Sequence, residues 1–227
     1  MVFNDSKLSA IRRWPTDLSR QWLEHYLGRA VYDPKILAVI AVGSSVRDVP
    51  KSNDLDLVAI TNEDPANSRE LPPLEIDFRL YASKGLEEKI KNGNDYIGWA
   101  VKFGKVLHEK DEYWTKLVRR LEGKVPMPSA KVARDRAAVA VENVRALLRV
   151  GDDDAALEQL VSLLTHIGRA VLIEAGVYPR SRPELSAQLM KISRPHLAQL
   201  LTHAIEGTST PKNIFTEFES NSECVPR

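Results

Sequence analysis

The chain has 227 residues, of which 43% are hydrophobic and 28% charged, an ordinary balance for a globular protein with a sizeable core. Its 32 basic and 31 acidic residues give a net charge of +1, which excludes the strong basic excess of many nucleic-acid-binding proteins. The single cysteine, Cys224, excludes an intrachain disulfide, and neither a membrane span of ~18–20 apolar residues nor a signal-peptide pattern is visible. We therefore expect a cytoplasmic protein without a membrane partner.

The first predicted element is a helix over residues 17–29, for which Thr16 or Asp17 can serve as the N-cap. The residues expected on its buried face are Leu18, Trp22, Tyr26 and Leu27. A continuous apolar run over 36–42 then predicts a strand that is covered on both faces. This strand ends at Gly43.

Two further predicted strands carry acidic residues. Residues 55–60 predict a second strand, and because side chains alternate along a strand, Asp54 and Asp56 should point to the same face. A polar loop over 62–73 leads to a third strand over 74–81. Its expected apolar face is Leu74, Ile76, Phe78 and Leu80, and its polar face is Glu75, Asp77, Arg79 and Tyr81. Two acidic side chains thus interrupt a second strand that is otherwise apolar, and a third acid, Asp77, lies on the polar face of the next strand.

The remainder of the first half consists of short elements. We predict helices over 84–91, 95–103 and 113–121 and an edge strand over 105–108. Residues 1–122 are therefore expected to form one domain with a small sheet. One glycine and two prolines at 123–128 predict a linker after it.

Residues 129–227 have apolar positions at helical spacing, which predicts a second, all-α domain. The predicted helices cover about 129–151, 152–175, 183–192 and 195–206. Ser129 is expected to cap the first of them and Gly151 to end it. The final stretch is polar and is expected to be loosely held. The predicted fold class is therefore α+β, a small mixed β-sheet with flanking helices followed by an all-α helical-bundle domain.

Five residues of the first domain form a pattern suited to phosphate and metal chemistry. Gly43 allows a ligand to approach the backbone closely, and the amides that follow it, with the Ser44 hydroxyl, can hold phosphate oxygens. Asp54 and Asp56 can share divalent cations, because Mg²⁺ prefers carboxylate and phosphate oxygens. If the second and third strands are antiparallel neighbours, Asp77 can join the same cluster.

The segment AVGSSVRDVPKSNDLDLVAI, followed by Asp77, resembles the DNA polymerase β-like nucleotidyltransferase superfamily. The signature of that superfamily is an apolar strand, Gly-Ser or Gly-Gly, a short spacer, Asp-x-Asp between apolar residues, and a third acid on a later strand. Arg47 lies where an arginine often lies in the minimal bacterial branch. The helical half is similar in layout to the helical domain of kanamycin-type nucleotidyltransferases. The resemblance implies a nucleotidyltransferase domain over 1–122.

The activity implied by this resemblance is transfer of a nucleoside monophosphate, AMP from ATP, to a hydroxyl of an acceptor, with release of pyrophosphate. The residues implied to bind the nucleotide are Gly43, Ser44 and Arg47, and those implied to bind two Mg²⁺ ions are Asp54, Asp56 and Asp77. The implied partners are a nucleoside triphosphate and an acceptor, such as an aminoglycoside-like small molecule. The chain is expected to be a monomer or a homodimer.

Several alternatives stay open at this point. The proton of the attacking hydroxyl could pass to Asp77, to its neighbour Glu75, or to an acid of the helical domain such as Glu142. The acceptor could instead be a tRNA or a protein, although the near-neutral charge does not favour tRNA. A catalytically silent nucleotide-binding module predicts that an acid of the pattern is missing, and none is. We interpret Arg79 as an ion-pair partner of Glu75 or Asp77 and His166 as a packed side chain.

Overall fold

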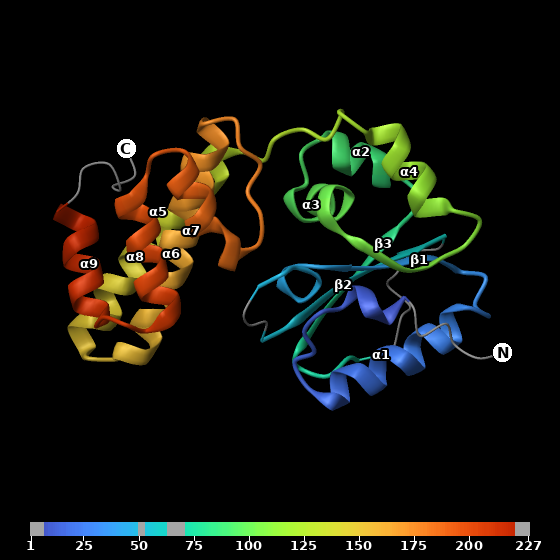
Figure 1. Cartoon of the computed structure of the whole chain (residues 1–227), viewed down its shortest axis with the longest axis horizontal. Coiled ribbons are helices and arrows are strands. Elements are labelled where there is room, and N and C mark those ends of the chain that lie inside the picture. Colours follow the sequence, from blue (N-terminus) through green and yellow to red (C-terminus); the bar gives the residue numbers. More distant parts are fainter. Residues whose placement is uncertain (1–6, 50–52, 63–70, 221–227) are drawn as a thin grey trace. The chain divides into compact units, whose positions relative to one another are not determined.

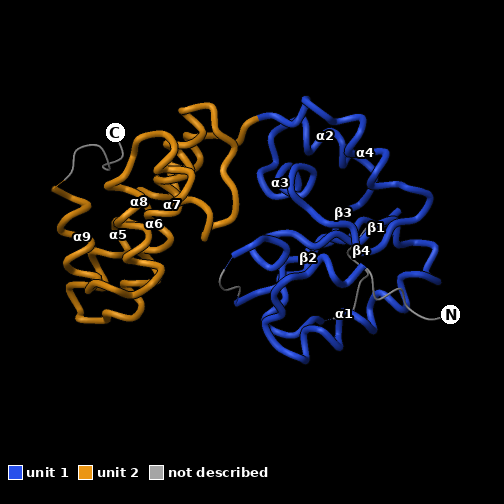
Figure 2. The backbone as a smooth tube through the Cα atoms, in the orientation of Figure 1, with its two compact units in different colours: residues 1–126 blue, residues 127–227 orange. Residues whose placement is uncertain are grey.

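The computed structural model of the protein describes residues 7–49, 53–62 and 71–220, and Cys224 lies outside them. The chain divides into two compact units, Met1–Pro126 and Met127–Arg227, which Figure 2 distinguishes by colour. The first unit contains a β-sheet with helices and the second is helical. The predicted α+β fold class is therefore confirmed.

A four-stranded sheet in the order β3-β2-β1-β4 forms the centre of the first unit. The strands are β1 (Ile36–Val42), β2 (Leu55–Thr61), β3 (Ile76–Ala82) and β4 (Lys105–Glu109). β1 pairs antiparallel with β2 and with the edge strand β4, whereas β2 and β3 are parallel. The sheet is thus mixed, as predicted.

Helices cover both faces of this sheet (Figure 1). On one face lies α1 (Asp17–Ala30), which begins at Thr16, whose side chain accepts a hydrogen bond from the Ser19 amide. The helices on the other face are α2 (Leu86–Lys91), α3 (Asp95–Phe103) and α4 (Tyr113–Leu121). Two short 3-10 helices, η1 (Leu8–Ala10) and η2 (Ser44–Val46), complete the unit in the described part of the chain. Because apolar helices meet both faces, β1 is apolar throughout.

Two predicted core residues of this unit are exposed instead. Leu18 is 59% exposed, because α1 buries a stripe formed by Leu23, Tyr26, Leu27 and Ala30 that does not include it. Leu74 is fully exposed, because β3 begins only at Ile76, whose amide donates to the Pro73 carbonyl at 3.0 Å in the preceding turn. Both predictions were wrong, because the start of α1 sets the orientation of Leu18 and the turn before β3 sets that of Leu74.

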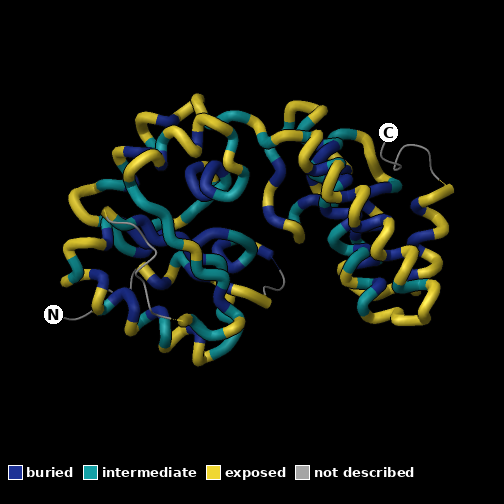
Figure 3. Tube along the Cα trace, turned by 180° about the vertical axis from the view of Figure 1, so that it is seen from behind, coloured by how far each residue is buried: buried dark blue, intermediate teal, exposed yellow. Residues whose placement is uncertain are grey.

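The second unit is a helical bundle, as predicted. Its helices are α5 (Ala130–Val150), α6 (Asp153–Glu174), α7 (Arg182–Lys191), α8 (Pro195–Glu206) and α9 (Pro211–Ser220). Ser129 caps α5 by accepting the Val132 amide, and Gly151 ends it with a φ of 76°. α6 packs against every other helix of the unit, and its inner face is buried (Figure 3).

The helix α9 corrects the expectation of a loosely held end up to Ser220. Ile214, Phe215 and Phe218 are almost fully buried against the bundle, although the segment around them is polar. The Thr210 hydroxyl accepts the Asn213 amide at 3.3 Å and so helps to start the helix. Three apolar side chains on one face are enough to dock a short helix whose other positions are polar.

One helix of the described chain, α6 with 22 residues, is long and apolar enough to cross a membrane by length and composition. The sequence predicts no membrane span, whereas this helix passes the test of length and mean hydropathy. Half of its most apolar window is buried inside the bundle, and the core helix of a globular protein passes the same test. This helix is therefore weak evidence for a membrane span.

Replacing Phe218 tests whether α9 is an integral part of the bundle. Phe218→Ala removes a ring that is 1% exposed and should lower the free energy of unfolding of the helical unit by roughly 3–5 kcal/mol. Urea unfolding followed by circular dichroism measures this loss. The exposed Lys212→Ala in the same helix is the control and should change it by less than about 0.5 kcal/mol. A Phe218→Ala effect as small as that of the control would contradict the docking of α9.

Candidate active site

The connection that leaves β1 is held in place by its own backbone. Gly43, at φ 76° and ψ −157°, turns the chain into η2, a conformation that is accessible essentially to glycine alone. The buried Ser45 hydroxyl donates to the Val42 carbonyl at 3.3 Å. The Ser45 carbonyl accepts the amides of Arg12 at 2.8 Å and Arg13 at 3.3 Å. The residues around Gly43 and Ser44 are thereby fixed against the sheet and the N-terminal segment.

Asp56 lies directly against Gly43. The two strands pair so that Asp56 faces Val42, the residue before the glycine. A Cβ atom added to Gly43 would lie only 1.9 Å from the Asp56 Oδ2 atom, closer than two such atoms can approach. The glycine is therefore required both by its backbone conformation and by the carboxylate beside it.

Asp56 and Asp77 occupy directly paired positions on β2 and β3. The sequence analysis allowed for this meeting only if the strands were antiparallel, and the structure pairs them in parallel instead. Register partners in a sheet still point to one face, so the parallel arrangement also brings the two carboxylates together. Their face is the one covered by α3, because Val58 and Ile60 of β2 pack there.

The pKa of Asp56 is raised from 3.8 to about 7. Burial is the largest cause, followed by the negative charges of Asp54 and Asp77, whereas Arg79 and Tyr96 act in the opposite direction. The charges of Asp54 and Asp77 both act on Asp56, so the three predicted aspartates lie near one another at one end of the β2–β3 pair. At neutral pH the cluster favours a cation or a proton.

Arg79 supplies a cation from within the chain. Its guanidinium donates to both Asp77 oxygens, at 2.6 Å from Nη2 and 3.1 Å from Nε. The hydrogen bond to Asp77 raises the pKa of Arg79, which stays charged. Of the two partners that the sequence analysis considered for Arg79, the structure thus selects Asp77. Glu75 lies before β3, where its backbone carbonyl accepts the Leu55 amide at 2.8 Å.

Tyr96 of α3 is a site residue that the sequence analysis missed. Its ring lies 3.7 Å below the Arg79 guanidinium, and its hydroxyl donates to the Asp56 Oδ1 atom at 3.5 Å. Burial, together with the charges of Asp56 and Asp77, raises the pKa of Tyr96, so the hydroxyl stays protonated. The available signal was its place at the start of a helix whose aromatic residues recur at helical spacing.

The donor atoms of this cluster fit a hard divalent cation in their chemistry, because all are carboxylate oxygens with excess negative charge. Among the residues that the structure describes, however, no three Asp, Glu, His or Cys side chains converge into a ready-made metal cage. Asp77 is bound to Arg79 instead. The residues that would hold a metal ion directly are therefore Asp54 and Asp56, with Asp77 available once Arg79 moves.

Ser44 and Arg47, the other predicted nucleotide contacts, belong to the same β1–β2 connection. Ser44 is the first residue of η2. The Arg47 guanidinium lies 5.5 Å from the centre of the Phe103 ring, which in turn packs 5.0 Å from Trp99. Arg47 thus rests on aromatic side chains of α3, the helix that also contributes Tyr96.

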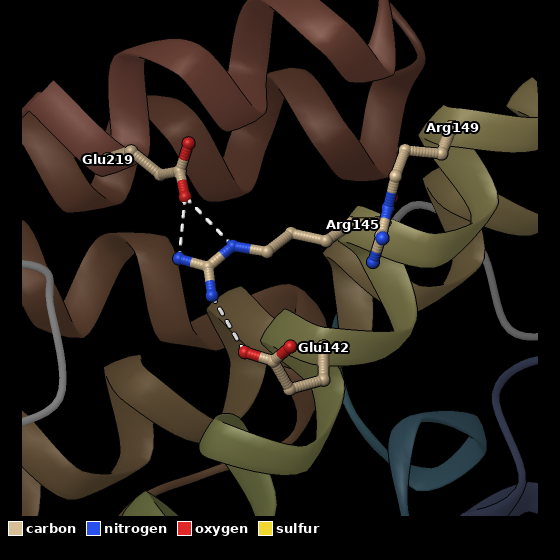
Figure 4. Close-up of polar contacts among 4 residues, drawn as sticks. All are labelled: Glu142, Arg145, Arg149 and Glu219. Carbon is tan, nitrogen blue, oxygen red and sulfur yellow. Dashed lines mark hydrogen bonds and ion pairs between the residues drawn. The ribbon is translucent and has the colours of Figure 1, made fainter.

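Glu142, the acid considered in the helical unit, is part of an ion-pair network (Figure 4). It accepts a hydrogen bond from Arg145 at 2.7 Å, and the same guanidinium binds Glu219 of α9 at 2.7 Å. Arg149 extends this network by donating a hydrogen bond to the Arg145 backbone carbonyl at 3.2 Å. These contacts tie α9 to α5 and give Glu142 a structural explanation.

His166 on α6 is half-buried, in line with the packed side chain that the sequence predicted. Its Nδ1 atom has no hydrogen-bond partner within the described part of the chain. Burial, followed by the charges of Arg169, Arg136 and Arg182, lowers its pKa to about 4. The ring is therefore neutral near pH 7.

Comparison with known proteins gives little beyond these observations. No protein-family model matches the chain, and no curated protein matches it. Among solved structures, the chain is similar to a nucleotidyltransferase-like protein from Exiguobacterium sibiricum 255-15, with a TM-score of 0.42 and 18% identity. The match covers 88% of this chain and 71% of the other.

The contact between Gly43 and Asp56 can be tested with a matched glycine. Gly43→Ala should lower the free energy of unfolding by more than about 3 kcal/mol, because it combines backbone strain with a clash. Gly151→Ala is the control: its φ is also 76°, but nothing lies within 4 Å of the added carbon, so about 1–2 kcal/mol is expected. Thermal unfolding measures both. In an Asp56→Ala background the extra loss at Gly43 should shrink, and an undiminished loss would exclude the clash as its cause.

The raised pKa of Asp56 predicts how stability depends on pH in the metal-free protein. The folded state binds more protons than the unfolded state between pH 3.8 and about 7, so the free energy of unfolding falls as the pH rises through this window. Asp56→Asn removes this loss and should stabilise the protein at about pH 8, by at most ~4 kcal/mol at 1.36 kcal/mol per pKa unit. Urea unfolding in a chelator at about pH 4 and pH 8 measures it. A difference between variant and wild type that is the same at both pH values would refute the assignment.

Proposed function

We propose that the protein is a metal-dependent nucleotidyltransferase that moves a nucleoside monophosphate, AMP from ATP, onto a hydroxyl of an acceptor. The observation that carries this proposal is the close packing of Asp56 against Gly43, opposite Asp77 and near Asp54. A glycine turn for phosphates and a group of carboxylates thereby lie at one end of the sheet. That combination suits the binding of a nucleoside triphosphate together with Mg²⁺.

Each residue has a defined task in this proposal. The backbone after Gly43, with the Ser44 hydroxyl, binds phosphate oxygens, and Arg47 adds a positive charge near them. Asp54 and Asp56 would hold Mg²⁺, which would supply Lewis-acid chemistry at the phosphate and at the attacking hydroxyl. The hydroxyl oxygen bonds to the α-phosphorus, the bond from that phosphorus to the bridging oxygen breaks, and pyrophosphate leaves. Asp77 accepts the proton of the hydroxyl, and Glu75 is the alternative proton acceptor.

The acceptor in this proposal is a small molecule with a free hydroxyl, such as an aminoglycoside-like compound. The net charge of +1 supplies no general attraction for tRNA. Incubation with Mg²⁺, labelled ATP and candidate acceptors would identify the molecule that becomes labelled.

A second candidate, a nucleotide-binding module without catalysis, is favoured by one observation. Arg79 neutralises Asp77 and so takes up the third carboxylate. Such a module would bind ATP in a Mg²⁺-dependent manner yet release no pyrophosphate with any acceptor. An enzyme releases it once the right acceptor is present.

Removal of the metal pair tests the proposed reaction. Asp54→Asn combined with Asp56→Asn should reduce pyrophosphate release from ATP by at least about 10³-fold, because the cation loses both of its direct ligands. A coupled pyrophosphate assay measures it. Asp48→Asn, an exposed carboxylate of the same connection that pairs with Arg12 at 3.8 Å, is the control and should keep wild-type activity. Pyrophosphate release at the wild-type rate in the double variant would refute the proposal.

A further inference from the structure

Arg79 occupies the carboxylate of Asp77, the side chain that would serve as a third metal ligand. Both oxygens of Asp77 accept hydrogen bonds from the guanidinium, so Asp77 has a cation before any metal ion arrives. The two side chains are 44% and 41% exposed. An ion pair with this exposure is screened by water and is weak enough to be displaced.

Tyr96 holds Arg79 in this position. The guanidinium lies over the tyrosine ring at 3.7 Å, a cation–π contact, while the tyrosine hydroxyl is bound to Asp56. The ring itself is fixed, because it lies in the first turn of α3, where the Asn94 side chain accepts the Ile97 amide at 3.2 Å. Tyr96 therefore links the counter-ion of Asp77 to the adjacent carboxylate Asp56.

We propose that Arg79 is a built-in counter-ion that competes with a divalent cation for Asp77, and that Tyr96 is the platform that retains it. This inference rests on the proposed metal-dependent function. A cation bound by Asp54 and Asp56 repels the neighbouring guanidinium, and Asp77 can become a ligand only when Arg79 leaves it. Arg79 is thus a positioning residue that sets the affinity of the site for metal ions.

Direct measurement of Mn²⁺ binding tests this competition without relying on activity. Arg79→Gln should bind Mn²⁺ roughly 3- to 10-fold more tightly than wild type, because Asp77 is freed and the local charge becomes more negative. Arg79→Lys keeps the charge and should lie between the two. Titration of the electron paramagnetic resonance signal of free Mn²⁺, at low ionic strength and about pH 8, gives the affinities. Arg120→Gln is the matched control, since Arg120 is also exposed and pairs with Glu87 at 3.7 Å elsewhere in the unit.

Two variants of Tyr96 separate the platform from the hydrogen bond. Tyr96→Phe keeps the ring under Arg79 and should stay within about twofold of the wild-type Mn²⁺ affinity. Tyr96→Leu removes the ring and should shift the affinity toward that of Arg79→Gln. Circular dichroism melting shows which variants are folded. If Arg79→Gln does not fold, Arg79→Lys still tests the competition.

The outcomes distinguish this inference from the function on which it rests. Tighter Mn²⁺ binding by Arg79→Gln and Tyr96→Leu, but not by Arg120→Gln, supports the competition. Unchanged or weaker binding by a folded Arg79 variant overturns it while leaving the metal site intact. If neither wild type nor Arg79→Gln binds Mn²⁺, the metal site itself fails, and the proposed function fails with it.

Discussion

The site depends on one contact, between the carboxylate of Asp56 and the backbone of Gly43. Antiparallel pairing of β1 and β2 sets their separation, and the absence of a side chain on Gly43 leaves the room that the carboxylate occupies. A glycine at the end of one strand and an aspartate on the next are thus coupled by a shared steric limit. Backbone pairing, rather than long side chains, brings the glycine turn and the acidic cluster together.

This arrangement gathers negative charge at a partly buried position, and Arg79 and Tyr96 limit the resulting loss of stability. Asp56 is opposed by Asp54 and Asp77, which raises its pKa, while Arg79 and Tyr96 oppose that effect. Charge crowding of this kind lowers stability and is typical of sites that bind or transform ligands. The helical unit shows the contrasting case, since Glu142 and Glu219 share one arginine and stabilise the docking of a helix.

Much of this site could be predicted from the sequence, because its parts are local. An apolar run ending in Gly43 and two aspartates that interrupt a strand are visible without a structure. The direction of β3 was not predictable, since alternation along 74–81 is the same for parallel and antiparallel pairing. Tyr96 was missed because its partners, Asp56 and Arg79, are distant in sequence. The docking of α9 was missed because three buried residues do not outweigh a polar composition.

The ion pair between Arg79 and Asp77 also bears on how the protein matures. Many small domains with a structural zinc site stay unfolded until the ion binds, because metal binding supplies much of their folding free energy. Here the chain carries its own positive charge into the acidic cluster, so the sheet can assemble in the absence of any metal ion. Under the proposed function, folding and metal loading would therefore be separate events, and removal of the ion by a chelator would leave an intact fold that can be loaded again.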